Sequence, residues 1–213
     1  MEGTYECNFF GVVPPIFKYD KACELNPRLY KVLFEGLSND IENDWEDSPD
    51  KKHDQDSEGG SFLISPRDLH LHGIKPVNIL MEWISSLIPR VTHYYSSPDP
   101  IEFNYDDYLP YSDNGGGKYN FDISRFKISH CWSVFYNKGD CVELHNHFPY
   151  ALSFAYYVNM PEGSSPIMID GEVIYPEEGQ VVFFPGSSFH SVPPSKVSGR
   201  CMIAGNKMSV DKY

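Results

Sequence analysis

The chain has 213 residues, enough for one domain with a substantial buried core. Its 30 acidic and 17 basic side chains give a formal net charge of −13, which argues against nucleic-acid binding through a broad basic face and against anionic membranes. Five cysteines without a CxxC pair fit neither a disulfide framework nor a thiolate zinc site, and no apolar run reaches the roughly 20 residues of a membrane span. We therefore expect a cytoplasmic protein without nucleic-acid or membrane partners, and the sequence carries no signal of oligomeric state.

Helical patterns lie in the first part of the chain, residues 1–95. Asn26 offers an N-cap and Pro27 suits the first helical position, while Leu29, Leu33 and Leu37 follow at a spacing of four. This pattern predicts an amphipathic helix that begins at Asn26 and packs on a sheet.

A second helix is predicted to begin at Lys75-Pro76 and to end before Pro89. Its apolar residues form one stripe: Ile79, Leu80, Trp83, Ile84 and Leu87. Between the two helices, residues 39–60 are dense in acids and poor in apolar side chains, so we expect a mobile surface loop there.

From about residue 120 onward the chain has the pattern of short strands separated by turns. Aromatic and β-branched residues alternate with Gly and Pro breaks, which favours an antiparallel sandwich or closed barrel. The predicted strands are residues 126–137, 151–159, 166–170, 172–175, 180–184 and 200–205. We expect a mainly β protein with flanking α-helices, in which one domain spans residues 1–213 and the helices support a core formed by residues 120–213.

Three histidines in this second part have the spacing of metal ligands. His145 and His147 are separated by one residue, so on an extended strand they project to the same face, and His190 follows from a distant strand. Neutral imidazole binds iron, zinc, copper and nickel well. Arg200, at the start of an apolar strand, is placed to point inward and to hold a carboxylate with its two-pronged guanidinium. The set predicts a metal with an anionic ligand beside it.

A second His-x-His pair, His70 and His72, shows that this spacing alone is weak support for a metal site. Its neighbours Leu69 and Leu71 indicate alternating exposure, and for this pair we favour an ordinary structural role.

In their order along the chain, these residues resemble one known family, the 2-oxoglutarate/Fe(II)-dependent oxygenases found in bacteria and bacteriophages. The resemblance is strong over residues 129–206 and looser at the N-terminus. It is carried by Trp132-x-x-x-Tyr136-x-x-Gly139-Asp140, His145-Asn146-His147, Ser153-x-x-Tyr156-Tyr157-Val158, Glu178-Gly179-x-Val181-x-Phe183-x-Pro185-Gly186, His190-Ser191-Val192-x-Pro194, Arg200 and Asn206.

The resemblance implies a double-stranded β-helix, a jelly-roll or cupin-like barrel, that holds Fe(II) and binds 2-oxoglutarate and O2. It implies that His145 and His190 are metal ligands and that Arg200 pairs with the distal carboxylate of 2-oxoglutarate, with help from Tyr136 or Asn206. The implied reaction is hydroxylation of a peptide or small molecule with release of succinate and CO2.

The chain departs from the wider superfamily at His147, where most members carry a carboxylate. Three alternatives stay open for the third ligand: His147 itself, a carboxylate from Glu143 or Asp140, or a position left to water or a halide. We favour His147, because it shares a face with His145 and Asp140 is committed to its turn.

Two other functions compete with the oxygenase. Gly139 followed by His145 and His147 also fits the first half of the cupin pattern, although Pro194 stands where its second half requires asparagine. A cupin-type metal-dependent dioxygenase or isomerase is therefore one alternative. A catalytically inactive barrel used for binding is the other, because a fold does not fix a function.

Overall fold

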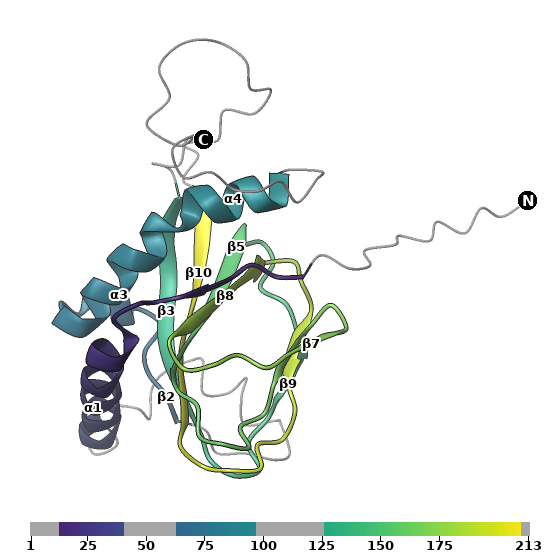
Figure 1. The fold of residues 1–213 in the computed structure, drawn as a ribbon. Coiled ribbons are helices and arrows are strands. Elements are labelled where there is room, and N and C mark those ends of the chain that lie inside the picture. Colours follow the sequence, from purple (N-terminus) through teal and green to yellow (C-terminus); the bar gives the residue numbers. More distant parts are fainter. Residues whose placement is uncertain (1–12, 41–62, 97–125, 210–213) are drawn as a thin grey trace, which may run out of the picture.

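The computed structural model describes residues 13–40, 63–96 and 126–209. Two antiparallel sheets face each other, and the helices cover the outer face of the larger one (Figure 1). The predicted acidic loop lies outside the described residues from residue 41 onward.

Helix α1, Ala22–Asp40, is the predicted first helix, but it begins four residues before the expected start. The Asn26 side chain does not cap a helix, because it is buried and accepts a hydrogen bond from the Tyr156 hydroxyl at 2.6 Å. Pro27 therefore lies inside the helix. Leu29 and Leu33 are buried, which confirms the apolar stripe for these two positions.

Helix α3, Lys75–Ser86, confirms the second predicted helix at both ends. Leu80, Ile84 and Leu87 of its apolar stripe are buried. A further helix, α4 (Ile88–Ser96), follows directly and was not predicted. Pro89 is tolerated as the second residue of α4, because the first backbone N–H groups of a helix make no hydrogen bond within it. A short 3-10 helix, η2, spans Leu69–Leu71. None of the helices in the described ranges is long and apolar enough to cross a membrane.

The large sheet has the strand order β1-β8-β5-β10-β3-β2 and the small sheet the order β4-β9-β6-β7. The large sheet comprises β1 (Ile16–Lys18), β8 (Gln180–Pro185), β5 (Leu152–Asn159), β10 (Arg200–Ser209), β3 (Phe126–Tyr136) and β2 (Leu63–Ile64). The small sheet comprises β4 (Val142–His145), β9 (His190–Val192), β6 (Ile167–Ile169) and β7 (Glu172–Ile174).

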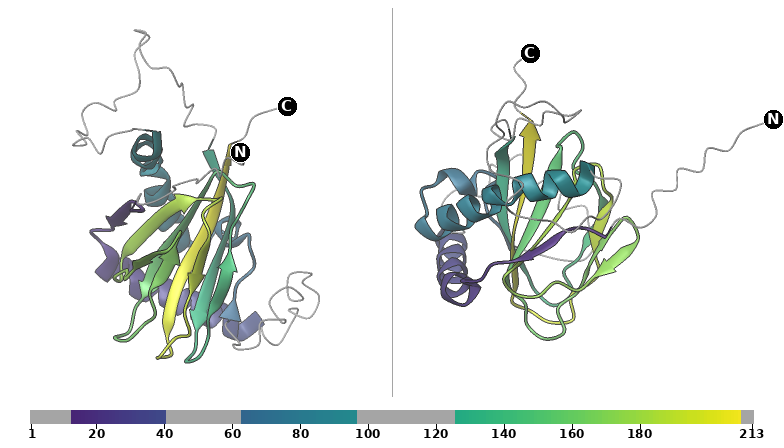
Figure 2. Two further views of the ribbon diagram at one scale, coloured as in Figure 1. Left: turned by 90° about the vertical axis from the view of Figure 1, so that its right-hand side faces the viewer. Right: turned by 45° about the horizontal axis from the view of Figure 1, so that its top comes forward.

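All six predicted strands are present, with ends within one residue of the prediction except for β10, which continues to Ser209. The mainly β class with flanking helices is confirmed. The strands hydrogen-bond in two separate sheets, and those of the described residues do not form a closed barrel. Figure 2 shows the helices on one side of the large sheet and the small sheet on the other.

The central strands of the large sheet are buried on both faces, because the helices cover one face and the small sheet covers the other. Successive side chains point in opposite directions and so enter two different clusters. In β10, Cys201 and Ile203 join a cluster under the helices, whereas Met202 and Ala204 join a second cluster that also includes residues of the small sheet. Strand β5 divides in the same way, with Tyr157 in the second cluster. This second cluster, between the sheets, is where the candidate site residues project.

Candidate metal centre

The structure brings His145, His147 and His190 together. His145 ends β4 and His190 begins β9, and the two are registered partners across these antiparallel strands. The ring centroid of His190 lies 4.2 Å from that of His145 and 4.7 Å from that of His147. One ring nitrogen from each histidine lies within 4.8 Å of the others, so a single metal ion can contact all three.

Burial keeps His147 and His190 neutral. His190 is 6% exposed, and desolvation lowers its pKa to about 3, with the charges that His145 and His147 would carry acting in the same direction. Desolvation likewise lowers the pKa of His147 to about 4, followed by the effect of His145. Neutral imidazole is the form that binds a metal.

Each histidine of the triad has its Nδ1 next to an oxygen. His145 Nδ1 lies 2.8 Å from the carbonyl oxygen of Glu143, and His190 Nδ1 lies 3.2 Å from that of Ser188. His147 Nδ1 lies 2.8 Å from the Asn206 side-chain oxygen. A carbonyl oxygen only accepts, so these contacts place the proton on Nδ1 and leave the Nε2 lone pair for a metal.

The Nε2 atoms of His145 and His147 are 3.2 Å apart. If both Nδ1 atoms carry the ring proton, two lone pairs face each other across this gap. Such an arrangement is unfavourable without a cation between the rings. The donor set therefore fits a divalent metal ion.

The two carboxylates considered as alternative ligands lie elsewhere. Asp140 is buried and accepts a hydrogen bond from the Asn137 amide at 2.7 Å, which commits it to its turn. Glu143 is exposed, and its backbone carbonyl holds His145. Within the described ranges, the cluster with metal-ligand geometry consists of the three histidines alone.

A turn of the main chain places His147, which lies beyond the end of β4. The His147 amide donates to the Gly186 carbonyl at 2.7 Å, and the Tyr150 amide donates to the His147 carbonyl. A Cβ atom at Gly186 would lie 2.0 Å from the Tyr150 carbonyl oxygen, so only glycine fits. The Pro185-Gly186 motif is thus part of the scaffold for His147.

Arg200 is fully buried between aromatic rings. Its guanidinium carbon lies 4.5 Å from the centroid of Tyr136 and 5.6 Å from that of Tyr157. All three of its guanidinium nitrogens lack a hydrogen-bond partner among the described residues. A buried cation without a partner is costly, so this pocket is suited to an anion such as a carboxylate.

The two residues expected to assist the cofactor have different positions. Tyr136 stacks on Arg200, with its hydroxyl 3.8 Å from the sulfur of Met202. Asn206 instead contacts His147. The structure thus separates the six candidates into a histidine group that includes Asn206 and an arginine group that includes Tyr136.

Ser153 and Tyr157 belong to the motifs that carry the resemblance, but the sequence interpretation gave neither of them a function. The Tyr157 hydroxyl is buried without a hydrogen-bond partner among described residues, beside Arg200, and burial raises its pKa to about 12. Ser153 is fully buried, with its hydroxyl 3.1 Å from His147 Nδ1. Both lie on the same face of β5, because residues two or four apart in a strand share a face. This spacing was the sequence signal that could have placed them together.

The second His-x-His pair does not join the triad. His72 Nε2 contacts Asp68 at 2.9 Å on the surface, an interaction between residues four apart. This contact gives His72 a local structural partner.

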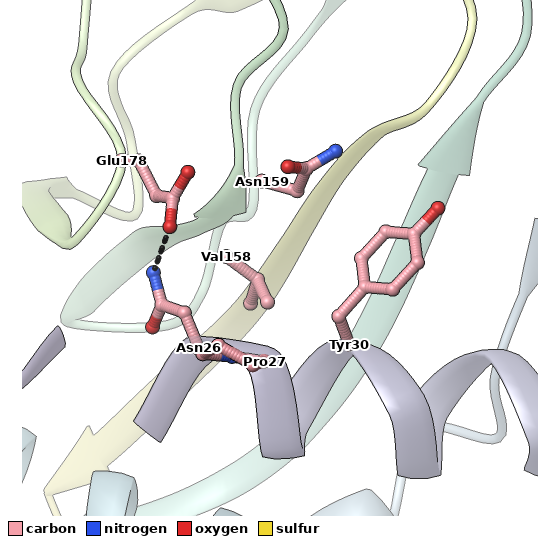
Figure 3. A pocket seen from close by; sticks show the side chains of 6 residues that line it. All are labelled: Asn26, Pro27, Tyr30, Val158, Asn159 and Glu178. Carbon is pink, nitrogen blue, oxygen red and sulfur yellow. Dashed lines mark hydrogen bonds between the residues drawn. The ribbon is translucent and has the colours of Figure 1, made fainter. Parts of the chain in front are cut away.

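A cavity of about 320 Å³ lies away from the histidines, between α1 and β5 (Figure 3). Asn26 and Glu178 meet in its wall at 3.3 Å. The other lining residues are Pro27, Tyr30, Val158 and Asn159. Because Asn26 is also bonded to Tyr156, its polar groups are already used within the protein.

No protein-family model matches the chain, and no curated protein matches its sequence. Solved structures do match. A prolyl-4-hydroxylase from Pseudomonas putida aligns over 91% of this chain and 91% of its own, with 13% identity and a TM-score of 0.55. A viral collagen prolyl hydroxylase from Paramecium Bursaria Chlorella virus-1, solved with 2OG, aligns over 92% of this chain and 96% of its own, with 11% identity and a TM-score of 0.54.

A more local match is an oxidoreductase of the 2OG-Fe(II) oxygenase family from Burkholderia pseudomallei, with 16% identity and a TM-score of 0.36. The alignment covers 39% of this chain and 45% of the other protein, so the chain spans less than half of that protein's length. The two longer alignments carry the structural conclusion. The chain shares the fold of the two prolyl hydroxylases.

Proposed function

We propose that the protein is a 2-oxoglutarate- and Fe(II)-dependent dioxygenase whose iron is held by His145, His147 and His190. Arg200 binds the distal carboxylate of 2-oxoglutarate in this proposal. The fold shared with two prolyl hydroxylases supports it, and we take the two facing sheets as the halves of a double-stranded β-helix.

One observation carries the proposal: a buried guanidinium without a hydrogen-bond partner among the described residues and three converging imidazoles project into the same region between two sheets. The link is Phe184, which belongs to the same cluster as Tyr136 and Tyr157 and whose ring lies 4.7 Å from that of His190. A metal alone would satisfy the histidines but leave Arg200 unpaired. A ligand that chelates the metal and carries a second carboxylate satisfies both.

The residues then have distinct roles. The triad fixes the metal through three neutral nitrogens, which leaves the site one unit more positive than a set with one carboxylate. The aromatic rings of Tyr136 and Tyr157 exclude water around Arg200, which strengthens its interaction with an anion. When bound, iron, 2-oxoglutarate and O2 supply the chemistry that hydroxylates a C–H bond and releases succinate and CO2.

For the substrate we propose a peptide, with a small molecule as the alternative. Support for the peptide comes from the two prolyl hydroxylases of the same fold. The net charge of −13 is compatible with a neutral or basic peptide.

The test is anaerobic titration of the purified protein with Fe(II) and then with 2-oxoglutarate. We expect an absorption band that requires both, and slow consumption of 2-oxoglutarate once O2 is admitted. Absence of the band would refute the oxygenase.

The same titration separates the alternatives. Three imidazoles without a carboxylate favour a cupin-type dioxygenase or isomerase as the second candidate, and that protein would bind metal but ignore 2-oxoglutarate. An inactive barrel that serves only for binding would show neither response.

A further inference from the structure

The three histidines of the triad are oriented in two different ways. His145 and His190 each direct Nδ1 to the backbone carbonyl oxygen two residues earlier, that of Glu143 and Ser188. Both acceptors are backbone atoms of the local chain, so these contacts do not require a particular neighbouring side chain. His147 lies outside a strand and has no such contact; its Nδ1 faces two side chains.

Those side chains come from neighbouring strands of the large sheet. Ser153 of β5 and Asn206 of β10 are registered partners, so they point to the same face, toward His147. The Ser153 hydroxyl donates to the Asn206 side-chain oxygen at 2.8 Å. Asn206 is 2% exposed and Ser153 is fully buried, so water does not compete with these contacts.

We propose that Asn206, held by Ser153, is a positioning residue that fixes His147 as an Nδ1–H tautomer and aims its Nε2 at the metal. The inference rests on the proposed metal site and gives Asn206 a role different from the cofactor contact expected from the sequence. An amide oxygen accepts a hydrogen bond from the ring N–H without adding negative charge. Asn206 and Ser153 thereby keep the third metal ligand, His147, neutral, whereas a carboxylate at that position would be an anion.

The energetic consequence concerns metal affinity. Without the Asn206 oxygen, the closer of the two acceptors, the His147 ring is less firmly oriented. The Nε2–H tautomer, which has no lone pair on Nε2 for the metal, then becomes populated. Loss of a hydrogen bond that orients a metal ligand typically lowers metal affinity by about 10- to 100-fold.

The test measures Co(II) and Zn(II) binding by the full chain without 2-oxoglutarate. We expect Asn206→Leu to weaken binding by about 10- to 100-fold and Asn206→Asp, which restores an acceptor, to bind at least as tightly as the wild type. Asn26→Leu is the matched control, because Asn26 is a buried asparagine that also accepts a hydroxyl hydrogen bond, from Tyr156. Equal metal affinities of Asn206→Leu and Asn26→Leu would overturn the inference.

A second measurement needs neither metal nor a fragile variant. Nitrogen NMR of the histidine rings reports the tautomer in the metal-free protein, where we expect His147 as Nδ1–H. A predominant Nε2–H form would overturn the inference even if Asn206→Leu failed to fold. If the wild type bound no metal while His147 was Nδ1–H, the proposed function would fail and the orienting role would stand.

Discussion

His145 and His190 are registered partners across β4 and β9, and each points Nδ1 to the carbonyl oxygen two residues before it. This repeated contact gives both rings the same tautomer. Two metal ligands are therefore preorganised by backbone alone.

The first prediction concerns these ligands. His190→Ala should abolish measurable binding of Fe(II) or Co(II), because two remaining imidazoles cannot complete the set. The loss of metal affinity should exceed the roughly 10- to 100-fold effect of removing a hydrogen bond that only orients a ligand. Calorimetric titration measures it, with His72→Ala as control, since His72 belongs to the surface pair with Asp68. Equal losses in both variants would contradict the assignment.

The second prediction separates cofactor from metal. Arg200→Met should weaken 2-oxoglutarate binding by about 2–5 kcal/mol, through loss of a buried charge pair, and leave Co(II) affinity unchanged. The ligand-free protein should become more stable by about 1–4 kcal/mol, because an apolar side chain replaces an unpaired buried cation. Binding titrations and chemical denaturation measure the two effects. Unchanged 2-oxoglutarate affinity would exclude Arg200 from the cofactor site.

The third prediction follows from the lowered pKa values of His147 and His190, about 4 and about 3 against an ordinary 6.5. Below pH 6.5 these two histidines bind more protons in the unfolded chain than in the folded one. The free energy of unfolding therefore decreases as the pH is lowered. Each histidine contributes up to about 1.4 kcal/mol per pH unit until its folded pKa is reached. Denaturation in the presence of a chelator measures the slope, which should be shallower in the double variant His147→Gln, His190→Gln. Equal slopes would show that these rings titrate normally.

The fourth prediction tests the scaffold of His147. Gly186→Ala should lower the free energy of unfolding by about 1–3 kcal/mol and weaken metal binding, because the added methyl collides with the Tyr150 carbonyl. Ser187→Ala, an exposed neighbour in the same turn, is the control. Thermal unfolding and Co(II) titration are the measurements. A Gly186→Ala protein that matched the control would show that the turn adapts freely.

Local sequence signals were reliable where burial and local preference agree. Runs of aromatic and β-branched residues predicted β3 and β5, and Lys75-Pro76 marked the start of α3. The signal at Asn26-Pro27 was misleading, because Asn26 is bonded to Tyr156, a residue 130 positions away. A distant partner of this kind leaves no trace in a local pattern.

By itself, the sequence determined the mainly β class and most strand positions, because strand-forming composition and turn residues are local properties. The spacing of the histidines and the resemblance to a family supplied the six candidate residues of the site. Tertiary structure decided which residues meet. Asn206 was assigned to the cofactor from its place in a motif, but the pairing of β5 with β10 puts it on His147 beside Ser153. That the buried Arg200 nitrogens have no hydrogen-bond partner in the described part of the chain likewise becomes visible only in the structure, since burial is a property of the folded chain.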